Sequence, residues 1–487
     1  MQRIAACILI ALTILSFPAI AQQQAGDGAT TLTVADENAT RAAQSEPRRR
    51  PRGVRGRPQE AEAAKPQEKK ETKKKKDKPD TWVAIQGADV YTVTDGVHEG
   101  TTILIKNGLI HEIGNAVKVP EKAETIDATG MRVYPGLISL TSRSIVGRPP
   151  VEDTTDPFSI NMVLALASGV TTVVSSNATA KLTYGEIENM TLVENPWIPL
   201  SYSSRNAGGK RNLRADFDRV RKYLRDKRAY DRAKSRGKED DLEEPNGKFL
   251  TGKFANYQKL LSGEKMGFFR RTNSASDMLA ICQLCREYGI RAIVEGGTEG
   301  WTIAPELGRA GVRMILTPRN RQNDDTRSNR MSGSSIENAA ILYNHGVTFA
   351  IQPPSGSISL GGQTGRDLLN VPMSAAFAVR GGLPESVALE TITIEPARLL
   401  GVDNQIGSIE VGKDADLIIT DGDILHYMTM VQWTLVNGKV VYDKEKEPLL
   451  RHIRPRSGEA EDIDNVWPRR WSEEKLKGTG PGVPQQD

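Results

Sequence analysis

Residues Tyr134–Ser144 read YPGLISLTSRS, and this stretch decides the fold. An apolar run that ends at Leu140 gives way to polar residues, which is the form of a barrel's first strand arriving at a functional site. The polar side chains at its end include Thr141 and Arg143. The strand therefore predicts a barrel mouth with polar and basic side chains.

Short apolar runs alternate with helical patterns downstream of this strand. The runs lie at 169–176, 265–273, 290–297, 311–318 and 346–354, and helical spacing at 277–288 and 335–343 precedes two of them. Repeated helix-glycine-strand units are typical of a parallel sheet and, at this length, of a closed (β/α) barrel. Two further strands are expected between Ala180 and Leu250, and Met190–Tyr202 is one candidate.

Both ends of this region carry antiparallel β patterns. Residues 81–93 and 101–114 are apolar runs broken by the turn sequences TDG and KNG, and residues 407–424 and 430–445 form a similar pair with an Asn437-Gly438 turn. Two half-sheets at opposite ends of a chain are expected to pair with each other. The alternating region would then be an insertion between them.

Three of these stretches resemble the amidohydrolase superfamily: Glu99–Leu140, Thr391–Asp423 and Val436–Asp443. The resemblance spans Trp82–Asp443 and is strongest to the imidazolonepropionase-like branch. It implies an α/β fold in which a distorted (β/α)8 TIM-type barrel, 136–401, is inserted in a small composite β-sandwich, 81–135 plus 402–445. Residues 446–487 would be a C-terminal tail.

Members of this superfamily use Zn or another divalent metal, which lowers the pKa of bound water and polarises the carbonyl under attack. In this sequence the family's ligand positions fall on Thr141, Arg143, Arg271, Gly296 and Pro354. None of these side chains can replace the imidazole or carboxylate that the family uses as a ligand there. Of five histidines, His345 precedes a strand and the others, His98, His111, His426 and His452, lie outside the barrel. The resemblance therefore predicts a degenerate metal site with no bound metal and no cofactor.

Basic residues remain at the predicted strand ends: Arg143, Arg270, Arg271 and Arg319. Guanidinium groups suit carboxylate and phosphate, so one hypothesis is that they bind a small anionic ligand. The alternative is that they pair with Glu295 and Glu299 and merely fill the barrel. Glu295 is also a weak candidate for a catalytic base, although one carboxylate is not a mechanism.

The N-terminus is typical of export. Residues 1–21 combine an arginine, an apolar run and a small-x-small cleavage site, so a cleaved signal peptide and a periplasmic or secreted protein are predicted. Residues 22–80 are predicted to be a disordered basic linker, because 47–79 hold 14 Lys or Arg against 5 Asp or Glu. Since no aromatic residue interleaves this run, no specific nucleic-acid binding is expected. No transmembrane segment is expected after cleavage.

Three hypotheses of function follow. The first is a pseudoenzyme, an exported amidohydrolase-family protein that acts as a binding module or as the partner of an active amidohydrolase homologue. The second is a hydrolase acting on carbon–nitrogen, but not peptide, bonds through an atypical site. The third is a structural envelope protein whose basic linker makes the contacts. The sequence favours the first, because the ligand positions have lost every group that binds metal.

Overall fold

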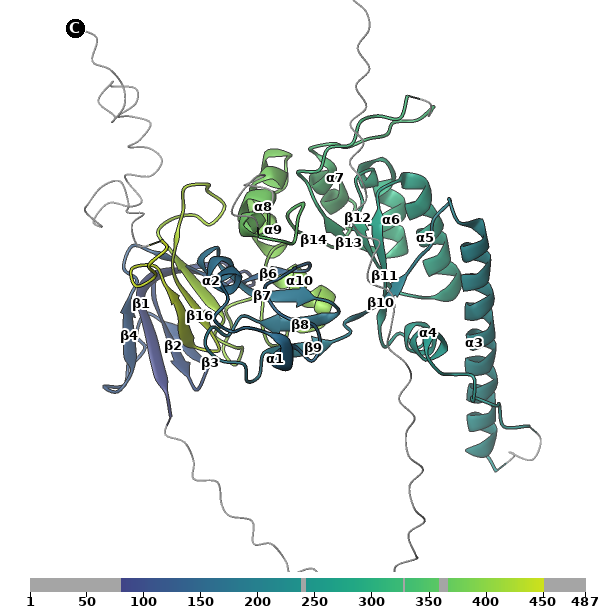
Figure 1. Ribbon diagram of the computed structural model, residues 1–487, viewed down its shortest axis with the longest axis horizontal. Helices are drawn as coiled ribbons and strands as arrows, with labels where there is room; N and C mark the ends of the chain where they lie inside the picture. Colours follow the sequence, from purple (N-terminus) through teal and green to yellow (C-terminus); the bar gives the residue numbers. More distant parts are fainter. Residues whose placement is uncertain (1–79, 238–241, 327–328, 359–366, 451–487) are drawn as a thin grey trace, which may run out of the picture. The chain divides into compact units, whose positions relative to one another are not determined.

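The computed structural model describes residues 80–450 except 238–241, 327–328 and 359–366 (Figure 1). The chain divides into units 1–75 and 76–487, and every described residue belongs to the second. The predicted signal peptide, nearly all of the predicted linker and most of the predicted tail lie outside the described residues. Within the described part, no helix has the length and apolar character needed to cross a membrane.

One eight-stranded sheet is built from both ends of the described chain, with the order β17-β16-β15-β5-β1-β2-β3 and β4 beside β1. Its strands are β1 (Trp82–Tyr91), β2 (Val97–Lys106), β3 (Leu109–Gly114), β4 (Glu124–Asp127), β5 (Arg132–Pro135), β15 (Leu417–Thr420), β16 (Val431–Val436) and β17 (Lys439–Asp443). Strand β15 runs antiparallel to β5, with Leu417 opposite Pro135. The predicted pairing of the two terminal segments is therefore present.

Left-handed turns set the hairpins of this sheet. Asn107 and Gly108 have φ angles of 52° and 86° between β2 and β3, and Asn437 and Gly438 have 50° and 71° between β16 and β17. Asn-Gly pairs accept two consecutive positive φ angles at little cost, and such turns match the twist of antiparallel strands. Both turns read from the sequence are confirmed.

The central region contains two further sheets. The first joins β6 (Leu137–Ser139) and β7 (Val170–Ser175) in parallel and continues antiparallel into β8 (Ala178–Lys181) and β9 (Thr191–Glu194). The second is wholly parallel and contains β10 (Trp197–Leu200), β11 (Met266–Thr272), β12 (Ala292–Gly296), β13 (Arg313–Leu316) and β14 (Phe349–Ile351). The alternation of strands and helices that the sequence predicted is present.

This arrangement differs from one continuous sheet of eight parallel strands. Ser176 and Asn177 have φ angles of 46° and 73°, so the chain reverses after β7 and forms an antiparallel hairpin instead of crossing to a parallel neighbour. The candidate stretch Met190–Tyr202 supplies β9 and β10, and only β10 pairs in parallel. Among the described residues of 201–250, helix α3 stands where a further strand was expected.

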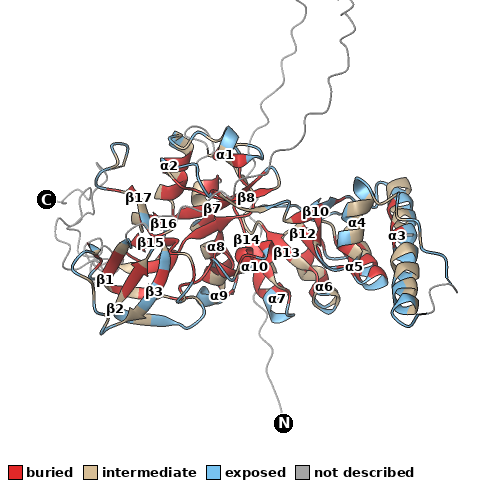
Figure 2. Cartoon of the chain, turned by 90° about the horizontal axis from the view of Figure 1, so that it is seen from below, coloured by how far each residue is buried: buried red, intermediate tan, exposed pale blue. Residues whose placement is uncertain are grey.

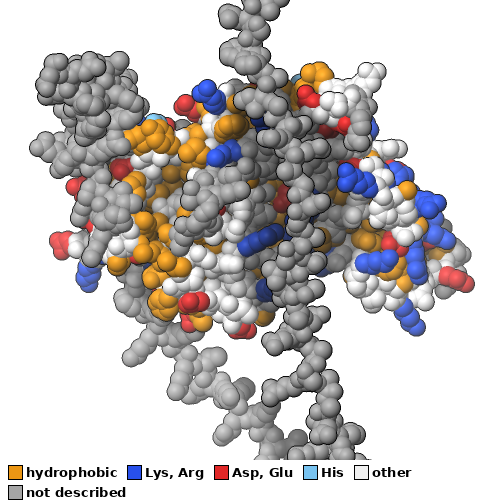
Figure 3. Space-filling view, turned by 45° about the horizontal axis from the view of Figure 1, so that its top comes forward, with side chains coloured by type: hydrophobic (Ala, Val, Ile, Leu, Met, Phe, Trp, Pro, Cys, Tyr) orange, Lys and Arg blue, Asp and Glu red, His pale blue; other side chains and the backbone are white. Residues whose placement is uncertain are grey.

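Helices connect and cover the strands, and Figure 2 shows buried strands beside helices with exposed outer faces. They are α1 (Val151–Thr154), α2 (Ile160–Ala167), α3 (Ala207–Lys234), α4 (Lys253–Leu261), α5 (Ala275–Tyr288), α6 (Ala304–Ala310), α7 (Asn338–Asn344), α8 (Val371–Arg380), α9 (Glu385–Glu390) and α10 (Ile394–Leu400), with 3-10 turns at Gly300–Ile303 and Leu368–Asn370. Helix α3 buries Leu213, Phe217 and Val220 at helical spacing, and most of its other side chains are charged. Its basic side chains lie at the right edge of Figure 3.

Side chains alternate along the parallel strands between two apolar cores. One core contains Ile138, Val174, Phe268, Ile293, Ile315 and Ala350. The neighbouring residues Leu137, Val173, Phe269, Val294, Leu316 and Ile351 belong to a second core, shared with the helices. Because successive side chains of a strand face opposite ways, the first set marks the inner side of the strands and the second set the helix side.

A buried ion cluster ties the β7–β8 hairpin to the eight-stranded sheet. Lys181 Nζ lies 2.7 Å from Asp414 Oδ2 and 2.9 Å from Asp416 Oδ2, and it donates to Asn437 Oδ1 at 2.6 Å. The Lys181 and Asp416 side chains are only 2% and 3% exposed. Burial raises the pKa of Asp416, although the adjacent ammonium opposes this shift. The carboxylate therefore needs its lysine to remain charged in the folded protein.

Replacing Lys181 tests this cluster. Lys181→Met leaves the Asp416 carboxylate buried without its ammonium, and we expect the free energy of unfolding to fall by about 3–5 kcal/mol. The control is Lys439→Met, which removes a pair with Glu186 in which both side chains are more than half exposed, and should cost less than about 1 kcal/mol. Urea unfolding of both variants measures the difference. Equal losses of unfolding free energy in the two variants would contradict the role given to Lys181.

Candidate functional site

A cavity of about 810 Å³ opens at the carboxyl ends of the parallel strands. Its lining includes the following residues: Thr141, Ser142, Arg143, Ser176, Asn177, Trp197, Arg270, Arg271, Asn273, Glu295, Gly296, Thr317, Asn320, Gln352, Pro354 and Ser355. Except for Trp197, which begins β10, these come from the carboxyl ends of β6, β7, β11, β12, β13 and β14 or from the residues that follow them. Parallel strands present their carboxyl ends at one edge, which is where such folds bind ligands.

The structure brings together nearly all of the predicted site residues. All five positions that the family resemblance assigns to metal ligands line the cavity, and so do Arg270 and Glu295. Arg319 is not among the lining residues, so it is removed from the candidate set. Thr317 and Asn320, which flank Arg319 in the sequence after β13, line the cavity instead.

Three guanidinium groups at this mouth have no acidic partner. Arg143, Arg270 and Arg271 are exposed, and within the described residues no carboxylate forms an ion pair with them. Glu295 is half-buried, and its Oε2 accepts the backbone N–H of Arg271 at 3.4 Å. The cavity is therefore net positive.

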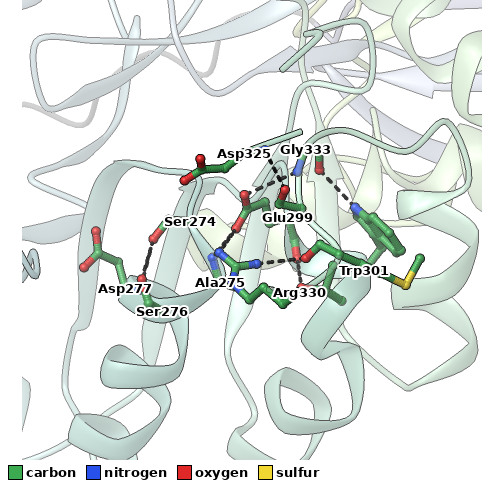
Figure 4. A network of polar contacts seen from close by, with 12 residues as sticks. Ser274, Ala275, Ser276, Asp277, Glu299, Trp301, Asp325, Arg330 and Gly333 are labelled. Atoms are coloured by element: carbon green, nitrogen blue, oxygen red, sulfur yellow. Dashed lines mark hydrogen bonds and ion pairs between the residues drawn. The ribbon is translucent and has the colours of Figure 1, made fainter. Parts of the chain in front are cut away.

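Glu299 does not neutralise these arginines, as the alternative interpretation required. Its carboxylate is buried and accepts from Ala275 N at 2.8 Å, Arg330 Nη2 at 2.8 Å and Gly333 N at 3.3 Å (Figure 4). Trp301 Nε1 donates to Gly333 O in the same network. Burial alone would raise the pKa of Glu299, but the three donors together hold this pKa below its ordinary value. Glu299 thus fastens the segment after β13 to the start of α5.

The acidity of Glu299 gives this clamp a pH dependence. Because its pKa is lower in the folded chain than in the unfolded chain, its contribution to stability is present above the ordinary glutamate pKa and is lost as the pH falls through the folded value. We expect Glu299→Gln to reduce the free energy of unfolding at pH 7 by about 2 kcal/mol, with the gap to wild type narrowing on acidification. Urea unfolding at several pH values measures this gap. The surface change Glu306→Gln is the control, and a pH-independent gap would refute the clamp.

The residues at this mouth do not fit a divalent metal. Among the cavity-lining residues, Glu295 is the sole carboxylate and there is no imidazole or thiolate, whereas zinc sites in proteins use several such ligands. Gly296 has a φ of 115°, and a Cβ added there would lie 2.4 Å from Asn273 Oδ1. This backbone has no room for a histidine at the family's position. Across the described residues, no group of three or more His, Cys, Asp or Glu could hold a metal ion.

Several polar residues of the cavity escaped the sequence interpretation. Gln352 is buried, and its Oε1 accepts from Thr141 Oγ1 at 3.0 Å across two strand ends. Asn177 lies in the left-handed turn after β7, and Asn273 accepts from Thr298 Oγ1 at 2.9 Å. The one signal in the sequence that could have found these residues was their position, because each lies at or just after the end of a predicted strand. Amides at strand ends are too common for position alone to mark a site.

The Cys282-x-x-Cys285 pair has a packing role. Both thiols are free and buried on α5. Burial raises the pKa of Cys282 to about 11 and that of Cys285 to about 12. Thiols with such pKa values are not thiolates near neutral pH, so they behave as small apolar side chains.

Comparison with known proteins gives the family. A profile described as the amidohydrolase family matches residues 302–450. A 56-residue stretch is 46% identical to dihydroorotase of Geobacter metallireducens, covering 12% of this chain and 13% of that protein. Another, of 73 residues, is 40% identical to N-acetylglucosamine-6-phosphate deacetylase of Rattus norvegicus, covering 15% of this chain and 17% of that protein. The chain thus matches only a small part of the length of these curated relatives.

A solved structure is similar over a longer span. The amidohydrolase from Thermotoga maritima MSB8 aligns with a TM-score of 0.54 and 20% sequence identity, over 74% of this chain and 100% of that chain. At this identity the likeness concerns the fold, and it supports a TIM-barrel-like α/β architecture with mixed sheets. The family profile, the matching stretches and the fold together support membership of the amidohydrolase superfamily, as the resemblance in the sequence predicted.

Proposed function

We propose that this protein is a non-hydrolytic member of the superfamily that binds a small anionic ligand in the cavity at the strand ends. One observation carries the proposal: the positions that the resemblance assigns to metal ligands all line one cavity. Among the described lining residues, the charged groups are one carboxylate and three guanidiniums, and no described carboxylate pairs with these guanidiniums. A guanidinium has no accessible lone pair for a metal, but its planar fork of donors matches a carboxylate or phosphate. The site therefore recognises anions and does not activate water.

The finer features of the protein are part of the same proposal. The parallel strands would form a distorted (β/α)8 barrel inserted in a composite β-sandwich. Residues 1–21 would direct export to the periplasm or the medium, and 22–80 would be a disordered basic linker. The binding module would act with an active amidohydrolase homologue as its partner. The composition of the N-terminal segment and the loss of metal ligands support this part.

A hydrolase acting on non-peptide carbon–nitrogen bonds through an atypical site is the competing function. Glu295 favours it, because this half-buried carboxylate lines the cavity. A base still needs an electrophilic group that stabilises the oxyanion, and guanidiniums could fill that role. The two functions differ in what happens to a bound ligand, so one set of measurements separates them.

Binding and metal content test the proposal on the full-length protein. We expect elemental analysis to give far less than one equivalent of Zn, Mn, Fe, Co or Ni, since the cavity offers one carboxylate. Calorimetry with acetate, succinate and inorganic phosphate should detect binding of at least one of these anions. The affinity should fall about tenfold or more in Arg143→Ala, because a charged hydrogen bond is lost.

Arg148→Ala is the matched control, because Arg148 is an exposed arginine nearby that does not line the cavity. Stoichiometric metal, or turnover of cyclic amides and N-acyl compounds that Glu295→Gln abolishes, would establish the hydrolase instead. Absence of binding to all three anions would also reject the proposal.

A further inference from the structure

Strand β11 contains an irregularity at the edge of the cavity. Phe269 pairs with Val294 and Thr272 pairs with Gly296, so two residues of β11, Arg270 and Arg271, stand opposite Glu295 alone. This two-against-one pattern is a β-bulge, which is rare between parallel strands and recurs next to functional sites, where it redirects a side chain. The additional backbone N–H, that of Arg271, donates to the Glu295 carboxylate.

The bulge changes which way one arginine faces. Phe268 and Phe269 belong to the inner and the helix-side core respectively, so regular alternation would send Arg270 inward and Arg271 toward the helices. The guanidinium of Arg270 lies 5.3 Å from the Phe268 ring, as this alternation requires. Arg271 nevertheless lines the cavity beside Arg270, because its φ of 51° turns the backbone.

The left-handed conformation of Arg271 costs free energy, and it places two positively charged side chains at the same cavity. A left-handed backbone is unfavourable for a residue with a Cβ, and glycine would adopt it without that cost. Two adjacent guanidiniums with no acidic partner also repel each other. Strained residues of this kind persist where the strain serves a site. A group that carries two negative charges would satisfy both guanidiniums at once.

We propose that the β11 bulge makes Arg270 and Arg271 into a two-guanidinium clamp for a doubly charged anion, either a phosphate monoester or a dicarboxylate. The inference rests on the proposed anion-binding function and names its ligand class. A singly charged carboxylate can neutralise the charge of one guanidinium only, so the clamp discriminates by charge. Arg271 is the residue that determines this specificity, whereas Arg143, which also lines the cavity, serves binding in general.

Two substitutions of Arg271 test the clamp in the full-length protein. Arg271→Gln removes the charge and keeps a side chain in the left-handed conformation, and Arg271→Gly removes both the charge and the strain. Calorimetry should show that wild type prefers succinate or inorganic phosphate over acetate by about tenfold or more, and that both variants lose this preference. Whichever of the two dianions binds more tightly identifies the ligand class.

Thermal unfolding supplies the second readout. Arg271→Gly should melt above Arg271→Gln, because only glycine relieves the backbone. Asn189→Gly is the control for the glycine effect: Asn189 is exposed, has a φ of 58° and does not line the cavity, so binding should be unchanged.

The outcomes separate the clamp from the proposed function. If wild type binds acetate as tightly as it binds the dianions, the clamp is overturned and the anion site stands. The same follows if Arg271→Gln binds the anions like wild type while Arg143→Ala does not. Equal melting temperatures of the two Arg271 variants would also overturn it. If wild type binds none of the three anions, the proposed function itself fails.

Discussion

The antiparallel pairing of β5 with β15 is the contact on which the rest of the structure depends. It joins the two ends of the described chain and fixes the start of β6, because β5 ends at Pro135 and β6 begins at Leu137. Between them, Gly136 N–H donates to Asp416 O at 2.8 Å. A slip of one residue would turn every side chain of the strand to its other face. The register of this pair therefore decides that Ile138 faces the inner core and that Thr141 and Arg143 reach the cavity.

The buried cluster around Lys181 also supports the pairing of β5 with β15. Asp416 is a neighbour of β15 in sequence, and Lys181 ends β8, so the ammonium links the hairpin after β7 to the sheet that carries β5. A buried ion pair adds little stability compared with apolar packing, but breaking one is costly, so it specifies one arrangement over others. The cluster thus helps to position β7 and the cavity residues Ser176 and Asn177, which follow β7.

Local sequence signals predicted a large part of this fold. Turn chemistry predicted the Asn-Gly turns at 107–108 and 437–438, and periodicity predicted the five parallel strands after residue 195, because each depends on neighbours a few residues apart. The family resemblance located the cavity, since Thr141, Arg143, Arg271, Gly296 and Pro354 come together there. These residues lie far apart in sequence, and no local pattern would have joined them.

The remaining features depend on long-range geometry that a single sequence does not display. The reversal at Ser176-Asn177 replaced an expected parallel crossover, although neither residue is a glycine. The ion pairs join segments far apart in the sequence, and the sequence offers each charge many other partners. The pairs are Glu299 with Arg330 and Lys181 with Asp414 and Asp416. The bulge at Arg270 and Arg271 depends on where Glu295 lies on the next strand. The polar and charged cavity side chains belong to neither apolar core, whereas Leu140, Val174 and Trp197 line the cavity and belong to the inner core. On the proposed function, the mouth exchanges a metal for guanidiniums while the fold persists: positive charge that attracts an oxyanion remains, and the Lewis acidity that activates water is absent.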